Sequence, residues 1–455
     1  MFRLVNVVVI TMSIVFAAHA DKSPNIVFII ADDCTFRDIG CYGGQAHTPN
    51  IDRLADQGMR FTRCFQAAPM CSPTRHNIYT GQYPVKTGAY PNHTRVEPET
   101  KGIVHYLRPL GYDVVHTGKS HVKPSSVFDW RHLGKQKTID FDSVDDVLGS
   151  HTQSGEPLCL LVCSNEPHTP WTKGDRTRYP DDKIQLPPYL IDTPETRDAM
   201  ARYLAEITYF DQQVGDTLAA LEHHGMSDNT MVMVVSEQGN SLPFAKWTCY
   251  DSGLQSACIV RWPGKVSAGT INHALIEYTD FLPTFIEIAG GEIPAILDGK
   301  SLMPILAGRQ THKQYVYGEM TTRGINKGSP HYGIRSVRDE RYKYIWNFTP
   351  EAEFKNACTD SEIFRSWVRL AASGDSNARR LVNKYRYRPA VELYDIVADP
   401  FEMINLAESA DYHDVKKRLR RQLDRWMVHC GDQGQVTEMA ALRRQSRKRN
   451  QAQSP

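Results

Sequence analysis

Cys71 opens the stretch CSPTR, which brings a thiol and the guanidinium of Arg75 to within five residues of each other. The thiol could be a buried structural group, half of a disulfide, a thiolate nucleophile, or a cysteine that is converted to another group. Pro73 is typical of the first turn of a helix and Gly81 of the residue just after its end, so the sequence predicts a helix here. Cys71 would then lie at the helix N-terminus, where backbone N–H groups favour anions.

Two further sets of residues could act together with Cys71. Asp32 and Asp33 are adjacent carboxylates that repel each other unless a cation lies between them, although a solvated turn is the alternative. With Glu237 and Gln238 they offer the oxygen ligands that Ca²⁺ or Mg²⁺ prefers. Taken singly, members of the second set are typical of surface or packing residues, but together they could surround a small tetrahedral anion. This second set consists of Arg75, Lys119, His121, His168 and Lys246.

These polar residues follow apolar segments that predict buried strands. The strands are expected within residues 24–30, 112–121, 158–168 and 229–239. Helices are expected at 48–58 and 192–225. Alternating strands and helices predict an α/β fold with a large, mostly parallel sheet between helices, and such sheets bind ligands at the carboxyl ends of their strands.

The pattern changes after about residue 330. A hairpin with its turn near Asp339 and Glu340, a strand in VELYDIVADP and a terminal helix in DVKKRLRRQLDRWMVH predict a smaller antiparallel sheet with a helix. The predicted organisation is a leader at 1–20, an α/β catalytic domain at 21–330 and a C-terminal α+β subdomain at 331–435. Residues 436–455 are basic and predict a disordered tail, with polyanion binding as its alternative role.

The N-terminus and the overall charge bear on location and partners. A single arginine, an apolar run and Ala18-His19-Ala20 predict a secretory signal peptide, with a membrane anchor as the alternative. No later segment is long and apolar enough to span a bilayer, so we expect a protein exported to the periplasm or medium, or to a eukaryotic secretory or lysosomal compartment. The formal net charge of +1 does not point to a nucleic-acid partner.

Ten cysteines in an exported chain allow disulfides, but their spacing is irregular and contains no zinc pattern. Cys159 and Cys163 lie in one predicted strand, where four residues span about 13 Å. This distance is too long for a disulfide between them.

CSPTR with a downstream TG resembles the signature of the sulfatase family, C-x-P-x-R followed by T-G. PNIVFIIADD, HTPNIDRLADQGMRFTRCF, GKSH, PHTPW and ELYDIVADPFEMINLA resemble further elements of this family, in family order, between about residues 24 and 407. GKSHVKP and the segment beginning PPYLIDTPETRD resemble most the heparan N-sulfatase (sulfamidase) branch and its bacterial carbohydrate-sulfatase relatives. The resemblance implies an alkaline-phosphatase-like fold.

The resemblance also implies a modified residue and a metal. Cys71 would be oxidised to formylglycine by a formylglycine-generating or anaerobic maturation enzyme, and the hydrated aldehyde would be the nucleophile. The implied ligands are Asp32, Asp33, Glu237, Gln238 and the modified residue 71, with Ca²⁺ the usual ion and Mg²⁺ an alternative. The family usually carries Asp followed by Asn or His where this chain has Glu237-Gln238, so each side chain is one methylene longer.

The remaining roles transfer by position. Arg75 would steady residue 71 and the metal site. Lys119 and His121 would contact the sulfate and the hydrate, His168 would protonate the leaving group, and Lys246 would bind the sulfate. The implied activity is hydrolysis of a sulfate ester, or an N-sulfate, on a sulfated oligo- or polysaccharide such as a glycosaminoglycan. The alternatives are a phosphatase or phosphodiesterase of the same superfamily, and a non-catalytic glycan-binding relative.

Overall fold

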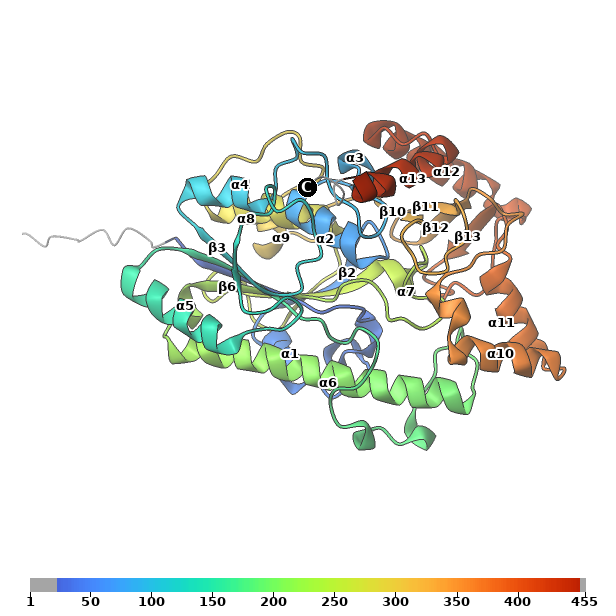
Figure 1. Cartoon of the computed structure of the whole chain (residues 1–455), viewed down its shortest axis with the longest axis horizontal. Helices are drawn as coiled ribbons and strands as arrows, with labels where there is room; N and C mark the ends of the chain where they lie inside the picture. The colour runs from blue at the N-terminus through green and yellow to red at the C-terminus, as the bar shows by residue number, and fades with distance from the viewer. Residues whose placement is uncertain (1–22, 451–455) are drawn as a thin grey trace, which may run out of the picture.

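A large sheet between two layers of helices dominates the molecule, with a smaller sheet and its helices beside it (Figure 1). The computed structural model describes residues 23–450, so the predicted leader at 1–20 lies outside the described range. The predicted α/β fold with a second, antiparallel sheet is confirmed.

The large sheet has nine strands in the order β4-β3-β5-β1-β6-β7-β2-β8, with β9 also paired to β2. The strands β4, β3, β5, β1 and β6 run parallel to one another, whereas β7 runs antiparallel to both β6 and β2. Their bounds are β1 Asn25–Ile30, β2 Met59–Phe65, β3 Asp113–Gly118, β4 Arg131–Leu133, β5 Leu158–Cys163, β6 Thr230–Val235, β7 Gln255–Arg261, β8 Thr270–Asn272 and β9 Ile276–Glu277.

Both faces of this sheet are covered, which explains why β1, β5 and β6 consist almost entirely of apolar residues. Val27 and Ile29 of β1 pack into one core, and Phe28 and Ile30 pack into the other. The first face carries α1 (Pro49–Asp56), α5 (Phe141–Ser154) and α6 (Pro194–His223) (Figure 1). The opposite face carries α2 (Cys71–Thr80), α4 (Ile103–Leu107), α8 (Phe281–Ile288) and α9 (Met303–Leu306). Two short helices, α3 (Pro84–Thr87) and α7 (Asp251–Leu254), complete this part.

The smaller sheet is antiparallel, in the order β10-β11-β12-β13. Its strands are β10 Val316–Thr321, β11 Gly333–Arg338, β12 Tyr342–Asn347 and β13 Val391–Asp395. Its helices are α10 Glu362–Ala372, α11 Ser376–Arg386, α12 His413–Cys430 and α13 Gln435–Asn450. Because β10 pairs with β11, this sheet begins before the boundary that the sequence predicts at residue 330.

The predicted disordered tail is wrong for residues 436–450, which belong to α13. The helix is fixed by contacts that its basic composition does not reveal. The hydroxyl of Tyr90 donates to the carbonyl of Thr437 (2.7 Å), Thr321 donates to the buried carboxylate of Glu438, and Ala441 is buried. The remaining tail residues, 451–455, lie outside the described range.

All ten cysteines lie within the described residues, and each is a free thiol. Within residues 23–450, no helix combines the length and apolar character needed to cross a bilayer.

Candidate active site

The sheet topology gathers the polar loops at one edge. In the order β3-β5-β1-β6 the strands are parallel, so the loops that follow them lie side by side. Two hydrogen bonds join these loops: the N–H of Asp32 donates to the carbonyl of Glu166 (2.9 Å), and that of Asp33 donates to the carbonyl of Glu237 (3.1 Å). The predicted grouping of residues after the four strands is confirmed.

A fifth strand, which the sequence analysis did not identify, brings Cys71 to this edge. β2 is antiparallel to β7, which is antiparallel to β6, so β2 runs in the same direction as β1 and β6. The chain leaves β2 at Phe65 and enters α2 at Cys71. Gly81, with φ +64°, ends α2, which confirms the predicted helix. Every residue of α2 is buried, and Cys71 is 3% exposed at its first position.

Four buried oxygen-bearing residues surround one side of Cys71. Asp32, Asp33, Glu237 and Gln238 are all 0% exposed. Ligand atoms of Asp32, Cys71 and Glu237 lie within 4.8 Å of one another. Among the described residues, no hydrogen-bond donor meets Asp32 Oδ1, Glu237 Oε1 or Gln238 Oε1. Buried acceptors without donors are costly unless a cation takes them, so this donor set fits a hard cation such as Ca²⁺ or Mg²⁺.

Gln238 takes part through both ends of its amide. Its Nε2 donates to Asp33 Oδ1 (2.6 Å), which leaves the amide oxygen as the acceptor without a donor. Both residues have left-handed backbones, with φ of +63° at Asp33 and +41° at Gln238. This backbone is uncommon for residues other than glycine and is held in place by the crossing hydrogen bonds of the loops. The longer side chain at position 238 therefore still reaches Asp33.

Two lysines bind Asp32 and Asp33 and lower the pKa of the Cys71 thiol. Lys119 Nζ donates to Asp32, and Lys246 Nζ donates to Asp33 Oδ2 (2.6 Å). Burial alone would raise the pKa of the Cys71 thiol, but the nearby ammonium groups of Lys246 and Lys119 lower it well below its usual value. An anion at position 71 is therefore favoured.

Arg75 lies one helical turn after Cys71 and is 0% exposed. Its guanidinium donates to the carbonyl of Lys119 and forms an ion pair with Glu237. Burial would lower the pKa of Arg75, but the carboxylates of Glu237 and Asp32 raise it well above its usual value, so it stays charged. Arg75 thus lies behind the pocket and joins α2 to the acidic residues.

Three histidines, His93, His121 and His168, line the pocket wall. His168 Nδ1 pairs with the carbonyl of Thr169 (2.6 Å), while its Nε2 lies 3.7 Å from Asp33 Oδ2. This carboxylate raises the pKa of His168, which keeps a proton available on the ring. His121 Nε2 contacts Nδ1 of His93 at 2.7 Å, and His121 Nδ1 is buried with no hydrogen-bond partner in the described chain.

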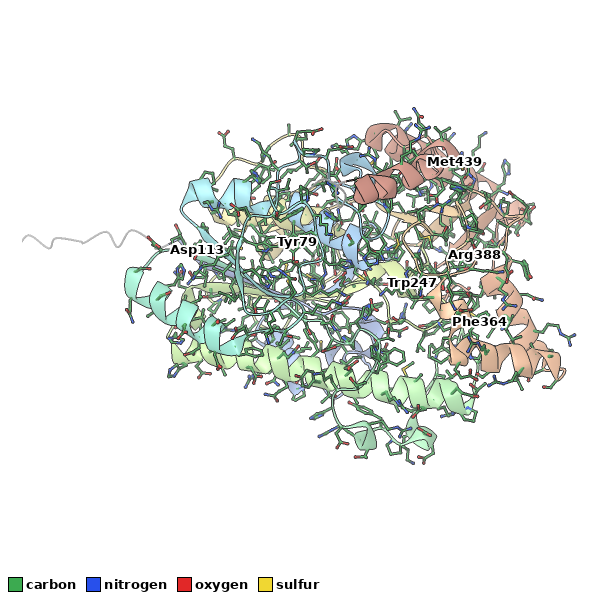
Figure 2. All side chains as sticks on the ribbon, in the orientation of Figure 1. Tyr79, Asp113, Trp247, Phe364, Arg388 and Met439 are labelled. Atoms are coloured by element: carbon green, nitrogen blue, oxygen red, sulfur yellow. The ribbon has the colours of Figure 1, made fainter. Side chains whose placement is uncertain are left out.

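A pocket of about 750 Å³ opens over these groups and unites five of the predicted residues. Its wall also contains Trp247 and, from the C-terminal part, Asn326. Figure 2 shows Trp247 between the large sheet and that part. The residues of the predicted set that line the pocket are Cys71, Lys119, His121, His168 and Lys246.

Sequence reasoning missed His93 and Ser241. His93 reaches the site from a loop after α3, and Ser241 donates to Asp33 Oδ2 (2.8 Å). Ser241 lies three residues after Gln238, which is the one signal that could have pointed to it. The sequence offered no comparable signal for His93.

Comparison with known proteins gives a consistent set of matches. The sulfatase family model matches residues 24–291, and the model of the C-terminal region of N-sulphoglucosamine sulphohydrolase matches residues 239–360. An ulvan-active sulfatase from Formosa agariphila is 34% identical over 423 residues, covering 90% of this chain and 81% of that protein. An N-acetylglucosamine-6-O-sulfatase from Bacteroides thetaiotaomicron is 23% identical over 527 residues, covering 89% of this chain and 86% of that protein.

Among solved structures, one in complex with its substrate D-glucosamine-2-N,6-O-disulfate superposes with a TM-score of 0.67. The two chains are 20% identical, and the match covers 90% of this chain and 99% of that one. At this identity, the superposition supports the arrangement of the two sheets and their helices.

Proposed function

Given that this chain belongs to the sulfatase family, we propose that it hydrolyses sulfate groups of a sulfated carbohydrate, using a formylglycine formed from Cys71 and a divalent cation. Sulfatases are sulfuric ester hydrolases that generally use a metal ion and a formylglycine. The observation that carries the proposal is the position of Cys71. It lies in the pocket at the N-terminus of α2, beside buried oxygens without donors, and two lysines line the same pocket.

The two special groups would supply different chemistry. Once hydrated, a formylglycine at position 71 would provide a geminal diol. One of its oxygens would attack sulfur as the bond from sulfur to the sugar breaks, and the other would re-form the aldehyde as sulfate leaves. A hard cation held by Asp32, Asp33, Glu237 and Gln238 would offset negative charge at this end of the pocket. Ca²⁺ is our first choice and Mg²⁺ our second, since the donors are carboxylate and amide oxygens.

The other pocket residues would bind the sulfate and move a proton. Lys119 and Lys246 line the pocket and would contact sulfate oxygens, and Arg75 would hold α2 in register with the acidic residues. His121, with a buried Nδ1 that lacks a partner in the described chain, would contact the sulfate or the diol. His168 would donate a proton from Nε2 to the departing sugar oxygen.

A carbohydrate substrate is supported by the relatives, since their names refer to ulvan and to N-acetylglucosamine. The sulfate group that is removed is either an O-sulfate or an N-sulfate. Lys119, Lys246 and His121 would contact its terminal oxygens and not the oxygen or nitrogen that joins sulfur to the sugar. We further propose that the protein is exported and that a formylglycine-generating or anaerobic maturation enzyme acts on Cys71 before activity appears.

The experiment begins with mass spectrometry of the peptide that contains residue 71, from a host with the maturation machinery. We expect an aldehyde in place of the thiol. We also expect Cys71→Ala to abolish turnover of a sulfated saccharide, while the far-UV circular dichroism spectrum stays unchanged. The phosphate ester of the same saccharide is the control and should be a poor substrate. Turnover by protein that contains only unmodified cysteine would contradict the mechanism, and faster phosphate hydrolysis would favour a phosphatase.

A further inference from the structure

The pocket has an unusual distribution of charge. Its wall contains four lysines, and no Asp or Glu is among the described residues that line it. The acidic residues Asp32 and Asp33 lie behind the wall and are already bonded to Lys119 and Lys246. The other two lysines, Lys123 and Lys137, therefore leave the pocket with net positive charge.

Lys123 and Lys137 are both exposed, and neither forms an ion pair with a carboxylate in the described part of the chain. Exposed lysines of this kind usually point into water without a partner and contribute little. These two differ because both line the same concave wall as the catalytic groups. A charged substrate that enters the pocket would displace water from around them and strengthen the attraction.

The backbones of the two lysines are fixed, which determines where their ammonium groups can reach. Lys137 donates its N–H to the carbonyl of Gly118 (3.2 Å), directly beside Lys119. Lys123 donates its N–H to His76 Nε2 (3.1 Å), and its carbonyl accepts from Val96 (3.1 Å). The two loops are also joined to each other, because Ser120 Oγ donates to Gln136 Oε1 (3.1 Å). The flexible side chains thus extend from rigid attachment points at the pocket wall.

We propose that Lys123 and Lys137 form a second anion subsite, which binds a carboxylate or a further sulfate on the same saccharide. This inference rests on the proposed function, since it assumes that the first sulfate binds beside Cys71. It makes Lys123 and Lys137 specificity-determining residues: saccharides with two anionic groups bind tightly, and saccharides with only the scissile sulfate bind weakly. A free aryl sulfate would not reach the subsite.

The test compares two sulfated disaccharides that differ only in having glucuronate or glucose beside the sulfated sugar. The Lys123→Gln/Lys137→Gln double variant should raise KM for the glucuronate compound about 10-fold or more, with kcat little changed. KM for the glucose compound and for nitrophenyl sulfate should stay within about twofold. A disulfated disaccharide serves as the third arm and shows whether a sulfate also occupies the subsite.

Lys135→Gln is the matched control, since Lys135 is an exposed lysine near Lys137 but does not line the pocket. It should leave all of these constants unchanged. If the double variant leaves KM for the glucuronate and disulfated compounds unchanged, or raises KM equally for every substrate, the subsite is disproved. A weaker effect at high salt is expected only for the anionic compounds.

A binding measurement separates this inference from the proposed function. Calorimetry with the glucuronate disaccharide that lacks the scissile sulfate requires no turnover. Binding that is lost in the double variant but kept in Lys135→Gln supports the subsite even if no sulfate ester is hydrolysed. Equal binding by the wild-type protein and the double variant overturns the subsite, whatever the hydrolytic activity of the mature protein.

Discussion

At the scale of single residues, Asp33 has the largest number of partners in the site. One of its oxygens accepts from Gln238, and the other accepts from Lys246 and Ser241 and faces His168. Removing this carboxylate would leave an ammonium group and a histidine without their counter-charge in a buried setting. The function of several neighbours therefore depends on one side chain.

We expect chelation to abolish activity and added Ca²⁺, or Mg²⁺, to restore it. Asp33→Ala should lose activity that excess metal does not recover, because the remaining oxygens no longer balance the cation. Ser241→Ala is the control. It removes a hydrogen bond to the same carboxylate and should weaken metal affinity by no more than about 10–100-fold. Undiminished turnover by metal-free protein would rule out the proposed cation.

His168 allows a test that depends on the leaving group. A sugar hydroxyl needs a proton as the S–O bond breaks, whereas a nitrophenolate needs little help. His168→Ala should therefore lose roughly 10²–10⁴-fold in kcat on a sugar sulfate and much less on nitrophenyl sulfate. If both substrates lose equally, His168 only holds the sulfate, and the acid role passes to His121.

At the scale of elements, the turn after β3 positions Lys119. Gly118 has φ +86°, and a Cβ atom there would lie 2.0 Å from the carbonyl oxygen of Cys163 in β5. The same carbonyl accepts the N–H of Lys119 (2.8 Å). Any side chain at position 118 must therefore push β3 and β5 apart at the point where the lysine enters the pocket.

Gly118→Ala should destabilise the protein by more than the roughly 1–3 kcal/mol expected from backbone strain alone, and it should reduce kcat. The control is Gly111→Ala. Gly111 has φ +88° but nothing within 4 Å of the added Cβ, so this variant carries the strain without the collision. Urea unfolding and turnover of both variants would check the difference. Equal losses of stability would show that the contact with Cys163 is unimportant.

The strands differ in how clearly their sequences predict them. The central strands β1, β5 and β6 were predictable because burial on both faces makes almost all of their residues apolar. β3 was also predicted, although it contains the buried polar residues His116 and Thr117. β2 was not identified, because Arg60 and Arg63 interrupt its apolar residues and a bulge between Phe61 and Cys64 breaks their alternation.

The residue types of the site were predictable, but their pairing was not. The contact between His93 and His121 joins two separate loops, and no local spacing encodes it. The bonds from Lys119 to Asp32 and from Lys246 to Asp33 likewise depend on how distant strands lie in the sheet. α13 was missed for a different reason: the contacts of Tyr90 and Thr321 with it come from segments far away in the chain.

At the scale of the whole molecule, Glu319 lies where the two sheets meet. It belongs to β10, its N–H donates to the carbonyl of Ala67 (2.7 Å), and its Oε1 accepts from the N–H of Val85 (2.9 Å). Burial raises the pKa of Glu319 to about 8, against the opposing effect of the nearby Arg335. The folded protein therefore keeps a proton on this carboxyl that the unfolded chain releases near pH 4.5.

The stability of the folded protein should depend on pH through Glu319. Because the folded state binds the extra proton, this group's contribution to stability is complete below about pH 4.5 and is lost as pH rises towards about 8. Glu319→Gln should flatten that decline, with a gain relative to wild type on the order of a few kcal/mol at pH 8. Glu408→Gln, at an exposed position, is the control. The free energy of unfolding would be measured at several pH values between 5 and 8. If it changes with pH by the same amount in the wild type and in Glu319→Gln, this assignment is contradicted.

The pocket wall contains residues from both the part with the large sheet and the part with the smaller sheet. Every residue that we place at the chemistry comes from the part with the large sheet, while Gly324, Ile325 and Asn326 come from the loop after β10. The loop after β10 can therefore change in sequence without a change in the residues at the chemistry. A change in the sequence or length of this loop would alter the shape of the pocket wall and would leave the reacting groups in place.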